Sequence, residues 1–325
     1  MSPTLTFIVR RLVQLVPVVL AIAALNFALL HLAPGDVADI IAASTGGSSV
    51  EFVEELRRSF GLDRPLYEQF FIFIGRLLVF DLGWSHIQQA PVLELVAERI
   101  PATLLLMLAA IVVAVVVGML LGILAAMRHR GWIDGVLSVL ALIVYATPQF
   151  WLGLMLIVLF SVTLGVLPSG GMMTIATQMG WLARAADIGR HLVLPSLTLG
   201  LFYVALYTRL MRASMLEVFT LDFITTARAK GLSETRIGFV HAARNALLPV
   251  VTLAGVQIGH ILGGSILVET VFGWPGLGRL VFDALLQRDL PLLLGVLLVS
   301  SVVVVLVNLA VDVLYGLLDP RIVQK

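Results

Sequence analysis

Long apolar runs dominate this chain of 325 residues and limit what it can fold into. A helix that crosses a membrane needs about 20 mostly apolar residues, because the hydrocarbon layer is about 30 Å thick and each residue adds about 1.5 Å. The runs that reach this length are 12–33, 100–127, 133–168, 192–210, 247–268 and 290–318. Since 60% of the residues are hydrophobic and 13% are charged, the sequence predicts an all-helical integral membrane protein.

Three apolar segments need individual interpretation. The run at 12–33 is longer than the apolar core of a signal peptide, which has about 7–15 residues, and is therefore expected to be an uncleaved first span. The stretch 70–80 is short and contains Arg76, so it predicts a buried or interfacial helix. The run 133–168 contains Pro148, which either kinks one long helix or separates two helices.

The positions of lysine and arginine residues favour one span at 133–168, because short cytoplasmic loops retain basic residues. Six spans would place twelve basic residues in short inner segments and four in short outer loops. Two separate spans at 133–168 would move the basic cluster at 209–244 to the outside. The distribution therefore predicts six spans with both termini in the cytoplasm, in the inner (cytoplasmic) membrane of a cell.

This topology divides the chain into four parts. They are an inner N-terminus with the first span (1–33), an extracytoplasmic domain (34–99), a core with the remaining spans (100–318, including a long inner loop at 209–248) and an inner C-terminus (319–325). In the outer domain, the sequence predicts a flexible turn at 46–49, a helix at 50–60 and a helix end at Gly61.

The chain lacks the residues that several kinds of chemistry require. It has no cysteine, and neither Lys230 nor Lys325 lies in the Gly-Lys-Ser/Thr pattern of a phosphate-binding loop. The six histidines show no metal-ligand spacing, and no acid, base and nucleophile form a recognisable catalytic set. The sequence therefore predicts no catalytic residue, metal or cofactor. The net charge of +1 gives no reason to expect a nucleic-acid partner.

Polar residues within spans are candidates for a translocation path, because they are costly in hydrocarbon and need partners. The residues predicted to line such a path are Gln149, Gln257, His260 and Asn308. Asn26 and Asp312 also lie within apolar runs, and Asp312 is the weakest candidate because it is near the end of its span. The alternative role for all of them is hydrogen bonding between helices. Glycines at 255, 259 and 263 add a stripe on which another helix could pack closely.

The inner loop at 209–248 is much longer than the other inner connections, which suggests that something binds it. Its sequence predicts a helix over 217–230, an end of this helix at Gly231 in the left-handed backbone conformation, and a second helix capped by Ser233. Apolar residues spread around the first helix, so it is expected either to enter a groove on a partner or to pack on the inner surface of its own protein.

The segment TARAKGLSETRIGFVHAARNALLPVVT resembles the coupling segment of binding-protein-dependent ABC importer permeases, in the form found in dipeptide, oligopeptide and nickel importers. Similar stretches extend along nearly the whole chain: HLAPGD, GLDRPLYEQF, DLGWS, ERIPATLLL, TPQFWLGL, LPSLTLGL, VETVFGWPGLGRL and VDVLYGLLDPRI. The outer segment also resembles the extra domain after the first span in one of the two permease subunits of peptide importers.

This resemblance implies a type I ABC importer permease that works with a second, related permease, two ATPase subunits, an extracytoplasmic binding protein and membrane lipid. It implies that coupling to the ATPase falls to Thr226, Ala227, Arg228, Ala229, Lys230, Gly231 and Leu232. One departure is that the broad family has Glu-Ala-Ala where this chain has Thr225, Thr226 and Ala227.

Short peptides are the expected cargo, and nickel, glutathione or another small solute are the alternatives within this class. A proton-coupled secondary transporter or a channel is the alternative from another class, and a membrane enzyme is a more remote one.

Overall fold

A computed structural model describes residues 3–32, 50–61, 63–85, 87–175 and 180–318. It divides into two compact units, residues 1–100 with 280–325 and residues 101–279. Each unit is described by itself, and two helices, α5 (Val92–Met127) and α12 (Leu277–Gln287), contribute residues to both.

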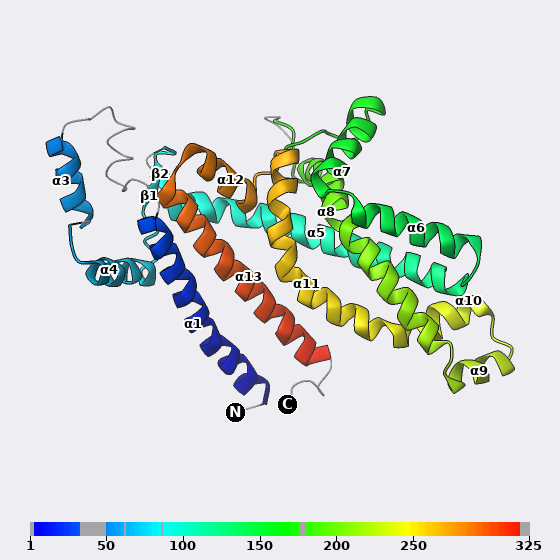
Figure 1. Ribbon diagram of the computed structural model, residues 1–325. Helices are drawn as coiled ribbons and strands as arrows, with labels where there is room; N and C mark the ends of the chain where they lie inside the picture. Colours follow the sequence, from blue (N-terminus) through cyan, green and yellow to red (C-terminus); the bar gives the residue numbers. More distant parts are fainter. Residues whose placement is uncertain (1–2, 33–49, 62, 86, 176–179, 319–325) are drawn as a thin grey trace. The chain divides into compact units, whose positions relative to one another are not determined.

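The first unit is built on two long apolar helices that pack along one another, α1 (Pro3–Leu32) and α13 (Leu290–Leu318) (Figure 1). Asn26 lies buried between them, and its side-chain amide donates a hydrogen bond of 3.3 Å to the carbonyl oxygen of Leu294. The predicted role of a polar residue as a link between helices is thus observed at Asn26.

The first unit also contains short elements that follow α1 in the chain. They are α3 (Val50–Phe60), α4 (Leu66–Leu78) and the antiparallel strands β1 (Trp84–Ser85) and β2 (Ala90–Pro91). The hydroxyl of Ser85 donates to the carboxylate of Asp289, which also accepts the backbone N–H of Leu292 in the first turn of α13. This carboxylate therefore fixes the strand pair to the start of the last helix.

The second unit is arranged around α8 (Trp181–Val218), which packs against α6 (Trp132–Ala146), α7 (Gln149–Leu156) and α11 (Ala243–Phe272). Glycines permit α5 to approach α8 closely. A Cβ atom at Gly122 would lie 2.6 Å from the Cβ of Met211, which is too short for a real contact. Two π-helical segments, η1 (Ile157–Thr163) and η2 (Ile237–Ala242), extend α7 and precede α11.

Ionic contacts hold the turn before α6. The guanidinium of Arg212 in α8 donates hydrogen bonds of 2.6 and 2.8 Å to the two carboxylate oxygens of Asp134, which is buried. The same carboxylate accepts the backbone N–H of Arg130, whose φ is +60°. A bidentate ion pair thus connects the start of α6 to α8.

Among the described residues, four helices are long and apolar enough to cross a membrane, and a broken helix pair makes a fifth if it is one span. The pair is α6 with α7 and η1, bent by 108° at Thr147 and Pro148. Pro148 therefore produces far more than the kink expected of one long helix. Because α1 includes a shorter described apolar stretch, Val16–Ala28, the count of six spans stays a prediction.

The local predictions had mixed outcomes. The helix predicted at 50–60 is confirmed as α3, followed by Gly61 with φ of +68°, whereas 46–49 lies outside the described residues. The short helix predicted at 70–80 is α4, and none of its residues is buried, so of the two predicted environments, buried or interfacial, the buried one is excluded. The helix predicted over 217–230 is wrong in extent, because α8 ends at Val218 and α9 (Asp222–Ala229) begins after a break.

Candidate functional site

Helix α9 and the closed turn that follows it contain all seven residues that the resemblance assigns to coupling, 226–232. We name residues 222–232, the helix together with its turn, the α9 turn. Gly231 has φ of +76°, as predicted, and its N–H donates to the carbonyl of Arg228, while the N–H of Leu232 donates to the carbonyl of Ala227. These two bonds form a Schellman motif, in which a left-handed residue lets the chain reverse and satisfy the last helical carbonyls. Ser233 then caps α10 (Glu234–Arg236) by accepting the N–H of Arg236 at 3.4 Å.

Two side chains of the α9 turn point into its own protein. Ile224 is completely buried and Ala227 is 7% exposed, and α9 packs against η2, where Ile237 is also buried. Ala227 therefore helps to hold the turn on η2.

The other side of the turn is open and partly apolar. Leu221 and Phe223 are 45% and 39% exposed, and Thr226, Ala229 and Lys230 are exposed as well. Figure 1 shows α9 and α10 at the end of α8 that lies away from α7. The segment thus presents a small residue, Ala229, next to a cation, and it carries two exposed apolar side chains at its start.

Arg228 already has an ionic partner within the segment. Its guanidinium donates hydrogen bonds of 2.8 and 3.1 Å to the two carboxylate oxygens of Glu234. This hydrogen bonding raises the pKa of Arg228 above its usual range. Within the part of the chain that the structure describes, Lys230 makes no ion pair, so its ammonium group is the cation free to meet a partner.

The predicted path residues lie on three helices that belong to two units. Gln149 begins α7, Gln257 and His260 lie in α11, and Asn308 lies in α13, which belongs to the other unit. Gln149, Gln257 and Asn308 are half-buried, and the side chains of His260 and Asp312 lie outside the described part. Their role in translocation stays a prediction.

The buried carboxylate of Glu269 is the polar group that sequence reasoning missed. It accepts hydrogen bonds from the hydroxyl of Thr103 (2.8 Å), the backbone N–H of Arg279 (3.0 Å) and the backbone N–H of Gly278. The carboxylate also occupies the space that a Cβ atom at Gly276 would need. Glu269 therefore joins the end of α11 to the start of α12 and to α5.

Neighbouring contacts strengthen this cluster. The indole N–H of Trp274, a fully buried side chain, donates to the carbonyl of Ala102 at 2.8 Å. The hydroxyl of Thr103 accepts the N–H of Leu277 at 2.7 Å. The signal in the sequence was a single glutamate within an apolar helix, close to the glycines and proline of VETVFGWPGLGRL.

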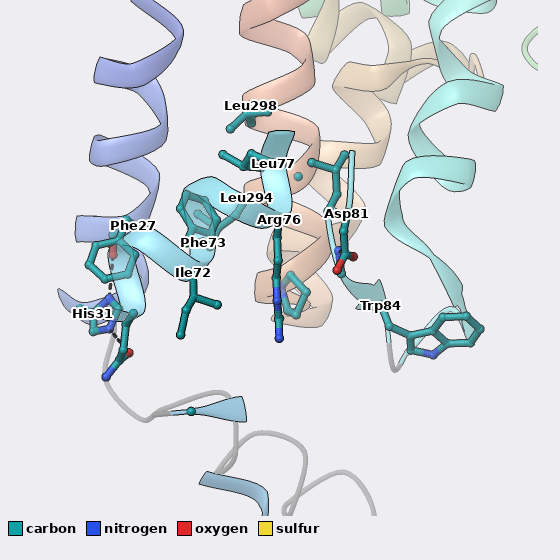
Figure 2. A pocket seen from close by; sticks show the side chains of 16 residues that line it. Phe27, His31, Ile72, Phe73, Arg76, Leu77, Asp81, Trp84, Leu294 and Leu298 are labelled. Carbon is teal, nitrogen blue, oxygen red and sulfur yellow. Dashed lines mark hydrogen bonds between the residues drawn. The ribbon is translucent and has the colours of Figure 1, made fainter. Parts of the chain in front are cut away.

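A cavity of about 200 Å³ lies within the first unit, between α1, α4 and α13 (Figure 2). Apolar side chains line much of it, including Phe73, Leu77 and Leu298, and the polar side chains of His31 and Arg76 also line it. No group of three or more potential metal ligands occurs in the described ranges.

Comparisons with known proteins identify the class of protein to which this arrangement of helices belongs. A solved structure titled as inward facing conformations of the MetNI methionine ABC transporter aligns with a TM-score of 0.54 and 20% identity, covering 71% of this chain and 95% of that one. At this identity the similarity concerns the fold alone, and it indicates the helical fold of a type I ABC importer permease.

The sequence comparisons then give the family. Residues 118–324 match the family described as binding-protein-dependent transport system inner membrane component, and residues 4–107 match its N-terminal membrane component. The chain belongs to this family of permeases, and it is a multi-pass inner-membrane protein.

Two curated relatives match almost from end to end. The glutathione transport system permease protein GsiC of Escherichia coli is 41% identical over 321 residues, which are 99% of this chain and 100% of the relative. The di/tripeptide transport system permease protein DppB of Pseudomonas aeruginosa is 40% identical over 332 residues, which are 98% of each chain. The resemblance to peptide-type importer permeases is confirmed.

Replacement of Glu269 by alanine should destabilise the protein strongly. The variant leaves the donors at Thr103, Gly278 and Arg279 without their acceptor, and each buried unsatisfied group costs about 1–3 kcal/mol. We expect a clear fall in the thermal unfolding temperature of the detergent-purified protein. The matched control is Glu217→Ala in α8, where an exposed change should cost less than about 0.5 kcal/mol. Equal melting temperatures for both variants would contradict the role of this carboxylate.

Proposed function

We propose that this chain is one of two different permease subunits in an ATP-driven importer of short peptides. The observation that carries the proposal is the end-to-end match to permeases named for glutathione and for di- and tripeptides. Glutathione is itself a tripeptide, so the two named cargoes share the chemistry of a short peptide with free charged ends. A short peptide is therefore the cargo class that agrees with both relatives.

Partners must supply the energy and the cargo. The chain has no Gly-Lys-Ser/Thr phosphate loop, and its family name specifies dependence on a binding protein. The proposed complex contains this chain, a second related permease, two ATPase subunits and an extracytoplasmic binding protein. The match of residues 4–107 to a separate N-terminal component supports a role as the permease that carries an additional outer domain.

The α9 turn is the proposed contact with an ATPase subunit. Ala229 permits close approach of a partner backbone, and Lys230 is available for an acidic group at the edge of a groove. Leu221 and Phe223 provide exposed apolar area beside it. Because Ile224 and Ala227 are buried against η2, a displacement of the α9 turn would be transmitted through η2 to α11.

Purification of the native complex tests the cargo and the composition together. We expect a second permease and two ATPase subunits to copurify, and a short peptide bound to the partner binding protein. Reconstituted with the ATPase subunits but without the second permease, this chain should show no peptide-stimulated transport. Transport by that reduced set would contradict the requirement for two different permeases.

The proposed orientation places the segment 34–99 outside and the α9 turn inside, with both termini in the cytoplasm. It rests on the twelve basic residues in short inner segments against four in short outer loops. Because the chain has no cysteine, Glu51→Cys and Ser233→Cys each introduce a single reactive thiol at an exposed position. A membrane-impermeant maleimide added to spheroplasts should label position 51 only, and labelling of both positions would overturn this orientation.

Replacement of Ala229 by aspartate should abolish transport without loss of the permease. The residue is exposed in the chain alone, so folding should change little, but an unpaired charge buried in a partner groove costs several kcal/mol. Such a cost weakens an association by orders of magnitude. We expect normal membrane abundance with loss of uptake and of ligand-stimulated ATP hydrolysis.

Two variants make the Ala229→Asp measurement specific. Ala229→Ser keeps a small side chain and should transport normally. Ala227→Asp should instead lower abundance, because Ala227 is buried within its own protein. Normal ligand-stimulated hydrolysis in Ala229→Asp would show that the α9 turn does not transmit the motion.

A further inference from the structure

An apolar stripe on α4 is largely exposed, and none of its side chains is buried by the described residues of its unit. Tyr67, Phe71, Ile74 and Leu78 recur at intervals of three and four residues and therefore lie on one side of the helix. Three of these side chains are unusually open, since Tyr67 is 64%, Phe71 is 70% and Leu78 is 78% exposed. Val79 and Phe80 continue the open surface directly after the helix, each 73% exposed.

A different side of α4 holds it against α1. The rings of Phe70 and Phe73 lie 5.3 and 5.9 Å from the ring of Phe27, between centroids, and Gln69 pairs with a ring nitrogen of His31 at 3.0 Å. The stripe is therefore a second apolar face that remains after the helix has packed.

The polar side of α4 turns away from the stripe. Arg76 lies five residues after Phe71 and two before Leu78, which places it on the opposite side of a helix with 3.6 residues per turn. Figure 2 shows Arg76 extending away from Leu77 and Leu298. The helix thus has an apolar side without charge and another side that carries Arg76 and lines the cavity.

The position and length of α4 indicate what covers the stripe. The helix contacts Phe27 and His31, where the apolar stretch Val16–Ala28 of α1 comes to its end. Its 13 residues reach about 20 Å, too short to cross a hydrocarbon layer of about 30 Å. Apolar side chains of α1 are exposed as well, including Val16 (58%) and Leu25 (60%). They indicate that hydrocarbon surrounds α1, the helix against which α4 packs.

We propose that α4 lies flat in the membrane interface beside the end of α1, with Tyr67, Phe71, Ile74 and Leu78 inserted among the lipid headgroups and upper acyl chains. Interfacial helices have this combination of an apolar face rich in aromatic residues and a polar face toward water. Tyrosine suits this depth because its ring is apolar and its hydroxyl is polar. The helix would anchor the additional domain to the bilayer surface, a role that the family assignment does not specify.

Fluorescence quenching in lipid bilayers tests this placement. The cysteine-free chain permits single variants Phe71→Cys and Leu78→Cys on the stripe and Arg76→Cys on the opposite side as the matched control. Each is labelled with the environment-sensitive dye NBD and reconstituted with its partner subunits into phosphatidylcholine nanodiscs. Quenching by nitroxide-bearing lipids is then compared with quenching by aqueous iodide.

We expect the dye at positions 71 and 78 to emit at shorter wavelength and to lose emission with nitroxide lipids, while position 76 responds to iodide. Since the replaced side chains are open, the variants should elute from size exclusion as the parent complex does. Equal iodide quenching at all three positions would overturn the proposal by showing that the stripe faces water. Protection of positions 71 and 78 from both quenchers would also overturn it, because a partner protein would then cover the stripe.

Discussion

A backbone within hydrocarbon must satisfy its own hydrogen bonds, and the rest of this structure depends on that constraint. A chain of this kind therefore crosses the membrane as helices. An interruption of a helix is costly unless other groups satisfy the backbone N–H and carbonyl groups that it frees. The break between α6 and α7 occurs at Pro148, a residue that has no N–H to lose. The hydroxyl of Thr147 satisfies the carbonyl of Ile143 in the last turn of α6 at 2.7 Å. Both residues reduce the cost of the 108° bend.

The same constraint explains where the charged and polar side chains gather in the second unit. Asp134 accepts hydrogen bonds from two nitrogens of a guanidinium and from a backbone N–H, and Glu269 accepts them from a hydroxyl and two backbone N–H groups. A carboxylate with this many donors can remain buried because its oxygens are almost fully satisfied. Each one also connects elements far apart in the sequence, such as α6 with α8 or α5 with α11. These polar contacts therefore supply specificity between helices whose apolar surfaces are chemically alike.

The sequence predicted those features that depend on local properties. The apolar run at 290–318 coincides with α13, and Gly231 adopts the left-handed backbone that its position suggested. The break between α8 and α9 was not predictable in this way, because residues 219–221 contain neither proline nor glycine. The helices there end for reasons of packing, with Val218 and Ile224 both buried.

Long-range contacts account for the remaining differences. Hydropathy treats Glu269 as one unfavourable residue in a span, and only the fold brings Thr103 and the backbone of α12 to its carboxylate. Similarly, the family resemblance assigned both Ala227 and Ala229 to the coupling segment, and the packing of α9 on η2 decides that Ala227 faces inward. For α4 the sequence allowed either a buried or an interfacial helix, and because none of its residues is buried, the first possibility is excluded.

The closed geometry of the α9 turn has a consequence for the thermodynamics of association. Its Schellman bonds, the cap at Ser233 and the Arg228–Glu234 pair all lie within one short segment, so hydrogen bonds inside the segment fix much of the shape of the turn. A flexible loop would lose conformational entropy on binding, at about 0.5–1.5 kcal/mol for each immobilised side chain. A preformed turn avoids much of this loss, and its small exposed surface can then support a contact that stays intact while the proteins on either side of it change shape.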